Sequence, residues 1–275
     1  MADGLMLSRA ELQSLANREK VGLGILEKDY VLTQVLNNIS QIDEMAGLFV
    51  FKGGTALRKT YFPDWRYSED LDFTVKHDMT EKELHNCLTN LYALMERTTG
   101  IKLLTLMLHK PNGYARLRIQ FIGPLAYRGR IFMDLSFDEP LCLEPVKRRL
   151  IARPFNIEER AILVYPLEEL LAEKIRSLVE RGKSRDYYDA WRITKEYLSG
   201  IDTGLLVDVL SKKLHHKHII LNSVNDFFPE DINNVRRYWI EDLSRQVDNL
   251  PGLDQVLDEL ASQLSDLIKP EFFRK

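Results

Sequence analysis

The sequence predicts an α+β protein, with a mixed β-sheet and flanking helices in residues 1–165 and an all-helical region in residues 166–275. In the first part, short apolar runs with strand-like alternation lie between segments that have helix-capping signals. From Pro166 onward the apolar residues recur at helical spacing. We therefore expect two domains, one on each side of this change in pattern.

The composition is that of a globular protein without a general attraction for nucleic acid. Hydrophobic residues make up 45% of the 275 residues, charged residues make up 29%, and the net charge is −3. A nucleic-acid partner would therefore have to meet a local basic patch. Cys87 and Cys142 form no CxxC pair, and we expect two buried reduced thiols. No stretch reaches the ~18 apolar residues that a membrane span requires, so we expect a cytoplasmic protein without a membrane partner.

Capping signals delimit the helices that we expect in the first part. Ser8 with Glu11 and Thr80 with Glu83 have the spacing of capping boxes, and each pair starts a helix. Gly100 ends the second of these helices. Another helix, with apolar residues at roughly helical spacing, follows the first.

Five strands are expected in the first part. "LFVF" (48–51) is a short buried strand, and Gly53 and Gly54 turn it into a helix. "DLDFTV" (70–75) alternates between apolar and polar residues as a strand does. Three further runs are joined by the turn sequences "KPNG" and "GPLAYRG", so we expect them to pair antiparallel. They are residues 101–108, 114–122 and 130–137.

The second part begins with two helices. Pro166 starts a helix that Gly182 ends, and "RDYYDAWRITKEYL" forms the next helix. The remainder is expected to be helical, with Pro229 and Pro251 at or near helix starts.

Three aspartates lie within strand patterns. Asp70 and Asp72 are two residues apart, so they project from the same face of their strand, about 7 Å apart at their bases. Asp134 lies within another apolar strand pattern, "RIFMDLSF". It can therefore be a third metal ligand on a neighbouring strand. Two such carboxylates repel each other unless a cation lies between them, and Mg²⁺ prefers oxygen ligands. The alternative is a strand face that bears its acids toward solvent.

These residues resemble the nucleotidyltransferase fold of the polymerase β superfamily, which has a glycine pair, a DxD strand and a later lone acid. Thr55 stands where that pattern often has serine, and it keeps the hydroxyl. A longer set of segments resembles the AbiEii/AbiGii toxin family of abortive-infection and toxin–antitoxin systems. The segments are "EKDYVLTQVL" (27–36), "FKGGTALRK" (51–59), "RYSEDLDF" (66–73), "EELLAEKIRSL" (168–178) and "RGKSRDYYDAW" (181–191).

The resemblance implies a metal-dependent nucleotidyltransferase toxin. It would use Mg²⁺ or Mn²⁺ to transfer a nucleotide from an NTP to an acceptor hydroxyl, with the tRNA 3′ end as acceptor and a cognate antitoxin as partner. Asp70, Asp72 and Asp134 would be the catalytic metal ligands. The nucleotide contacts would be Gly53, Gly54, Thr55, Arg66, Ser68 and Lys174. Two alternatives stay open, because fold does not fix function. One is an NTP-binding interaction protein, and the other is a transferase acting on a protein or small-molecule hydroxyl.

Three residues of the second part have site roles only through the resemblance. Asp186 and Asp189, from "RDYYDAW", are implied as catalytic, although either is also a first-turn acid that the helix dipole favours. Lys174 lies in an apolar helical stripe, so it must extend to solvent or meet an anion such as a triphosphate. Because a lysine there is costly, Lys174→Ala is expected to stabilise the fold slightly. Lys28 and Asp29 of "EKDY" are singled out by the resemblance without a mechanism.

The cations expected to meet RNA phosphates lie in two segments. One is the basic segment "KKLHHKH" (212–218), whose histidines lack the carboxylate or cysteine partners of a metal site. The other adjoins the glycine turn. The candidate residues are Lys212, Lys213, Lys217, Arg58 and Lys59.

Overall fold

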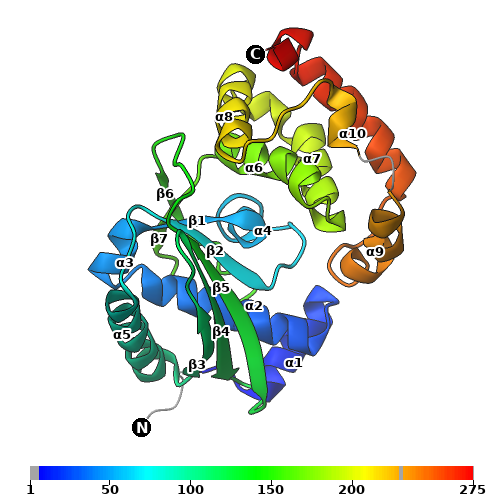
Figure 1. Ribbon diagram of the computed structural model, residues 1–275. Helices are drawn as coiled ribbons and strands as arrows, with labels where there is room; N and C mark the ends of the chain where they lie inside the picture. The colour runs from blue at the N-terminus through cyan, green and yellow to red at the C-terminus, as the bar shows by residue number, and fades with distance from the viewer. Residues whose placement is uncertain (1–5, 229–231, 275) are drawn as a thin grey trace. The chain divides into compact units, whose positions relative to one another are not determined.

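The computed structural model describes residues 6–228 and 232–274 (Figure 1). The chain folds into two units, each with its own core. We call Met1–Leu141 with Pro145–Val164 the sheet unit, and Cys142–Glu144 with Tyr165–Lys275 the helical unit. Within the described residues, no helix is both long and apolar enough to cross a membrane.

The sheet unit contains a seven-stranded mixed sheet of order β3-β4-β5-β2-β1-β7-β6. The strands are β1 Phe49–Lys52, β2 Asp70–Val75, β3 Lys102–His109, β4 Tyr114–Ile122, β5 Arg128–Ser136, β6 Val146–Arg149 and β7 Ala161–Val164. β3, β4 and β5 pair antiparallel, as the turn sequences predict. β2 pairs parallel to β5 and antiparallel to β1, and β1 pairs parallel to β7.

β6 and β7 were not predicted from the sequence. All four residues of β6, "VKRR", are exposed, so this strand has no apolar alternation to detect. β7 is a four-residue apolar run next to a predicted helix start, and periodicity cannot distinguish so short a run from a helix end.

The sheet unit also contains five α-helices among its described residues. They are α1 Arg9–Glu19, α2 Leu23–Ile39, α3 Asp43–Leu48, α4 Gly53–Ala56 with a π-helical turn Leu57–Tyr61, and α5 Glu81–Thr99. Both predicted capping boxes are present, and Gly100 ends α5 with a left-handed backbone. α2 contacts α5 and β5, and α5 contacts β3. The core lies between them, where Leu117, Ile119 and Met133 are buried.

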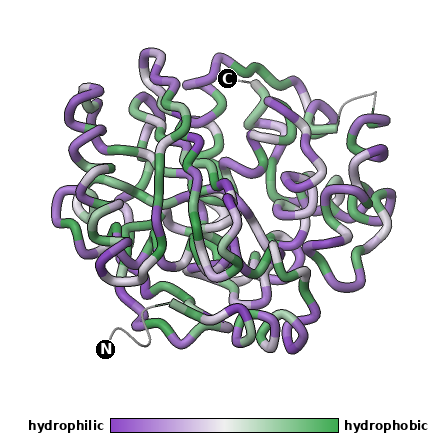
Figure 2. Tube along the Cα trace, turned by 90° about the horizontal axis from the view of Figure 1, so that it is seen from below, coloured by the Kyte–Doolittle hydropathy of each residue, from purple (hydrophilic) through white to green (hydrophobic). Residues whose placement is uncertain are grey.

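The helical unit consists of α6 Leu167–Glu180, α7 Ser184–Glu196, α8 Thr203–His216, α9 Asn233–Leu243 and α10 Leu253–Leu267. Short 3₁₀ turns cover Leu198–Gly200, Val224–Phe227 and Pro270–Arg274. The predicted stop at Gly182 is confirmed by its left-handed backbone, and Pro251 lies two residues before α10. Pro229 lies outside the described residues. Hydrophobic and hydrophilic stretches alternate along the trace, as amphipathic elements require (Figure 2).

Asp29 of α2 fixes the turn that follows the glycine pair. Its carboxylate is 1% exposed and lies 2.8 Å from Lys59 Nζ and 3.5 Å from Arg58 Nε. Burial holds the pKa of Lys59 below its ordinary value, although the nearby Asp29 carboxylate opposes this shift. Since this carboxylate holds both cations inside the sheet unit, the prediction that Arg58 and Lys59 meet RNA is wrong.

Asp29→Ala is expected to lower the free energy of unfolding by about 3–5 kcal/mol, because two buried cations lose their carboxylate. The control is Lys28→Ala at the neighbouring position, which removes a half-exposed ion pair with Glu69 and should cost at most about 1 kcal/mol. Urea denaturation measures both variants. Equal losses in the two variants would show that the buried pair does not stabilise the fold.

Candidate active site

Four charged residues form a row across the open face of the sheet. Lys52 of β1 pairs in register with Asp72 of β2, Asp72 pairs with Asp134 of β5, and Asp134 pairs with Arg116 of β4. Residues in register on adjacent strands project from the same face, so two carboxylates lie side by side with a cation at each end. We call these four residues the carboxylate row. Asp70 lies on the same face, two residues before Asp72 on β2.

Asp134 has two partners within β4. The hydroxyl of Tyr114 donates a hydrogen bond to Asp134 Oδ1 at 2.6 Å, and Arg116 Nε lies 3.6 Å from the same oxygen. Burial raises the pKa of Tyr114, and its hydrogen bond to the carboxylate raises it further. The phenol therefore stays protonated and serves as a donor that orients Asp134.

The glycine pair permits close approach of side chains to the start of α4. Gly53 has a φ of 77°, and a Cβ built there would overlap Asp72 Oδ2. A Cβ on Gly54 would lie 2.8 Å from Arg66 Nη2 and 3.3 Å from Ser68 Oγ. The structure thus brings the predicted residues of the glycine turn, the segment before β2 and β2 itself to one place. Both Arg66 and Ser68 are buried there.

Thr55 connects this turn to β2. Its hydroxyl donates a 2.5 Å hydrogen bond to the carbonyl oxygen of Asp70. Threonine and serine can both make this bond, so the hydroxyl is explained by its tether to the strand that bears Asp70 and Asp72.

The described residues, 6–228 and 232–274, include no group of three or more histidine, cysteine, aspartate or glutamate side chains gathered as a metal cluster. The carboxylates of Asp72 and Asp134 are neighbours through their strands, but Asp134 Oδ1 is turned toward Tyr114. Among the described residues, the three predicted ligands are therefore not gathered into a preformed three-carboxylate metal cluster.

Lys174, Asp186 and Asp189 form a buried cluster in the helical unit. Lys174 Nζ lies 2.7 Å from Asp189 Oδ2 and 3.2 Å from Asp186 Oδ1. Asp186 also accepts two hydrogen bonds of 2.8 Å from Arg181. The anion that Lys174 meets in this unit is thus a pair of aspartates. The expectation that Lys174→Ala stabilises the fold is therefore wrong, because the change would leave buried carboxylates without this cation.

Lys213 is fully buried, so the prediction that it meets RNA is wrong. Its Nζ lies 2.8 Å from Glu169 Oε1 and 3.3 Å from Glu173 Oε1. The sequence contained the signal, since Lys213 shares a helical face with the buried residues Leu206, Val209 and Leu210. Of the "KKLHHKH" cations, Lys212 is exposed.

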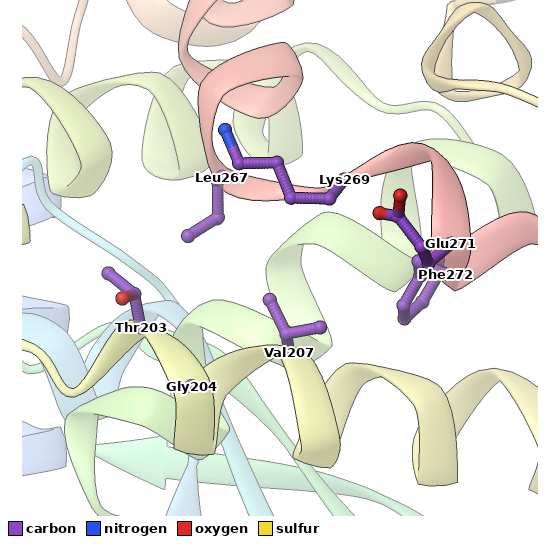
Figure 3. Close-up of a pocket in the computed structure, with 7 residues that line it drawn as sticks. All are labelled: Thr203, Gly204, Val207, Leu267, Lys269, Glu271 and Phe272. Atoms are coloured by element: carbon purple, nitrogen blue, oxygen red, sulfur yellow. The ribbon is translucent and has the colours of Figure 1, made fainter.

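Two pockets are lined by residues outside the carboxylate row. One, of about 330 Å³ in the helical unit, is lined by Val207 of α8 and by Leu267, Lys269 and Phe272 near the C-terminus (Figure 3). The other, of about 230 Å³ in the sheet unit, is lined by polar residues of α2 and α5 with Glu158 and Arg160. None of the lining residues is a predicted site residue.

Comparisons with known proteins agree with this fold. The family model described as "Nucleotidyl transferase AbiEii toxin, Type IV TA system" matches residues 35–266. The chain therefore belongs to the AbiEii family of nucleotidyltransferase toxins, as its motifs predict. Among solved structures it is similar to MenT4, a nucleotidyltransferase toxin from Mycobacterium tuberculosis. The TM-score is 0.74 at 18% identity, over 98% of this chain and 92% of that chain. This likeness confirms the predicted fold class. No curated protein matches.

Gly53→Ala is expected to lower the free energy of unfolding by at least about 1–2 kcal/mol, since it forces a left-handed residue to bear a Cβ and displaces Asp72. The control is Gly47→Ala in α3, where a Cβ would have no atom within 4 Å. This control should be within about 1 kcal/mol of wild type or above it. Chemical denaturation compares them, and equal stabilities would mean that the turn tolerates a side chain.

Asp186→Asn is expected to lower stability at pH 7 by about 3–5 kcal/mol and to flatten its dependence on pH in acid. Burial raises the pKa of Asp186, but Lys174 and Arg181 outweigh burial and hold it well below the usual 3.8. The wild-type contribution is therefore complete above about pH 4 and is lost as the pH falls further.

Urea titrations between pH 2 and 7 test this expectation, with the exposed Asp258→Asn in the same unit as the control. A wild-type pH profile in Asp186→Asn would contradict the assigned ion pairs.

Proposed function

We propose that the carboxylate row and Asp70 form the centre of an NTP-dependent nucleotide transfer. Membership of the AbiEii family supports the reaction class. The observation that supports the location best is the register of β2 and β5, which sets Asp72 beside Asp134 directly against the glycine turn. The proposed catalytic acids are Asp70, Asp72 and Asp134.

We propose Mg²⁺, or Mn²⁺ in its place, as the cofactor. Asp70 and Asp72 are half-buried carboxylates on one strand face, and proteins commonly hold Mg²⁺ through one or two carboxylates together with substrate phosphates and water. Their donor set therefore fits this ion, and Asp134 is proposed as a third ligand, since only its Oδ1 accepts the hydrogen bond from Tyr114. When bound, the ion would neutralise part of the negative charge of the triphosphate.

The chain's own residues position the nucleotide. Gly53 and Gly54 have no side chain to keep a phosphate from the backbone N–H groups at the start of α4. Arg66 and Ser68 lie against Gly54, where a guanidinium and a hydroxyl can contact the same phosphate oxygens. Thr55 acts indirectly, because its hydroxyl holds the turn against Asp70.

In the proposed reaction, the oxygen of an acceptor hydroxyl attacks the α-phosphorus of the NTP. A new phosphorus–oxygen bond forms, and the bond to the leaving pyrophosphate breaks. The hydroxyl proton passes to Asp134, whose carboxylate the hydrogen bond from Tyr114 orients. The acceptor proposed from the family resemblance is the 3′ end of tRNA, and a cognate antitoxin is the proposed protein partner.

The catalytic roles implied for Lys174, Asp186 and Asp189 remain part of the proposal. Within the helical unit their contacts support a role in holding α6 to α7, since Lys174 comes from the first helix and both aspartates come from the second. Asp189 makes the shorter contact with Lys174 and is fully buried. A role in transfer would require Lys174 to keep its charge, so Lys174→Arg is the variant that separates charge from size.

Asp72→Asn is expected to lower the rate of transfer by more than about a thousandfold. The free energy of unfolding should change by less than about 1 kcal/mol. The assay incubates the protein with each labelled NTP in turn, Mg²⁺ and total RNA. Removal of Mg²⁺ by chelation should have the same effect on transfer. Asp78→Asn is the control, since Asp78 follows β2 but is exposed.

Each outcome of this assay favours one reading. Label on RNA that Asp72→Asn loses supports the proposal, and label on protein or a small molecule supports the other acceptor classes. NTP binding without any transfer supports an interaction protein. A large drop in the melting temperature of Asp72→Asn would make the acids structural and would contradict the proposal.

A further inference from the structure

Four arginines lie on the open face of the sheet beside the carboxylate row. They are Arg116 and Arg118 of β4 and Arg128 and Arg130 of β5. On both strands the alternate residues, such as Leu117 and Met133, are buried beneath the helices. The arginines therefore project from the face that bears Asp134. We call these four residues the arginine strip.

Most of the charge of the arginine strip is not neutralised within the protein. Arg116 lies 3.6 Å from Asp134, but in the described part of the chain Arg118, Arg128 and Arg130 have no ion pair with an acidic side chain. The Nε of Arg118 also has no hydrogen-bond partner although it is buried. In a chain with a net charge of −3, this is a local excess of positive charge.

The four arginines of the strip form a line that ends beside Asp134. Arg118 is in register with Phe132, and Arg130 is in register with Gln120, so Arg118 and Arg130 are diagonal neighbours about 7–8 Å apart. Residues two apart on one strand are separated by about 7 Å. The guanidinium groups therefore follow one another from Arg128 to Arg130, Arg118 and Arg116, and the last of them adjoins Asp134.

Rings and apolar side chains accompany these cations. Phe132 is half-buried between the arginines, with the guanidinium of Arg116 4.9 Å from its ring centre. Leu104 and Met107 of β3 are exposed and in register with β4 residues, Met107 with Arg118. Ile122 of β4 is exposed and in register with Arg128. Cations in a line with interleaved aromatic and apolar groups suit a single nucleic-acid strand, whose phosphates bind the cations and whose bases stack.

We propose that the arginine strip binds the single-stranded end of an RNA acceptor and leads its terminal hydroxyl to the carboxylate row. This inference rests on the proposed transfer function. The carboxylates of the row repel phosphates, but a terminal hydroxyl is uncharged and is the part of a strand that can lie beside them. The strip takes the place of Arg58, Lys59 and Lys213, which are buried in ion pairs.

The test measures binding of a labelled 12-nucleotide single-stranded RNA to the full chain over a salt series. R128Q/R130Q removes two cations that are exposed and lie outside the carboxylate row. We expect the affinity at 0.1 M salt to fall about 25-fold and the slope of log K against log salt to decrease by about 1.4, because each phosphate contact on a single strand adds about 0.7. NTP binding should be unchanged.

Two variants serve as controls. R128K/R130K keeps the charges and should keep the salt slope. R9Q/R97Q removes two exposed arginines from α1 and α5, outside the strip, and should bind RNA as wild type does.

The outcomes separate the inference from the function on which it rests. A wild-type salt slope in R128Q/R130Q would overturn the strip as an RNA surface and leave the proposed transfer intact. Loss of binding to an acidic protein partner, with RNA binding unchanged, would assign the strip to that partner and also overturn the inference. If RNA binding depends on the strip but no NTP is ever transferred, the strip stands and the proposed function fails.

Discussion

The register between β2 and β5 is the constraint on which the site depends. Successive side chains along a strand point to opposite faces. A one-residue shift in the pairing of β2 with β5 would therefore place the Asp72 side chain in the core and the Phe73 side chain on the open face. The buried face of β2 prevents this slip, because Phe73 packs against the rings of Phe49 and Phe51. The same apolar packing that stabilises the sheet therefore determines where the carboxylates lie.

Three buried lysines lie against acids of the same unit. Lys59 meets Asp29 in the sheet unit, whereas Lys174 meets Asp189 and Lys213 meets Glu169 in the helical unit. Each pair joins two helical segments that are distant in sequence or face each other across a turn, so these charges specify how the helices pack. They also remove three lysines from the surface. The arginines on the open sheet face therefore contribute a larger share of the exposed positive charge than the total number of basic residues suggests.

The sequence was sufficient for the parts of the fold that depend on local signals. Ser8 and Thr80 begin helices where their capping boxes predict, and β2 alternates as its pattern indicates. β6 and β7 were missed because four-residue strands have no period to read. For the site, a strand pattern could place Asp70 and Asp72 on one face, but the in-register neighbour Asp134 and its hydrogen bond from Tyr114 arise only from pairing distant strands. The arginine strip went unnoticed for the same reason, since its members come from two strands.

Glu169 has a consequence for how the chain can be divided. Besides Lys213, its carboxylate accepts hydrogen bonds of 2.9 Å from the backbone N–H groups of Cys142 and Leu143. Three residues from the middle of the sheet-unit sequence therefore belong to the helical unit, and the chain passes between the units three times. No single cut yields two self-sufficient fragments, because a piece ending at Val164 takes residues 142–144 away from their acceptor. Gene fusions or recombination events that join foreign sequence at this point would exchange an incomplete module.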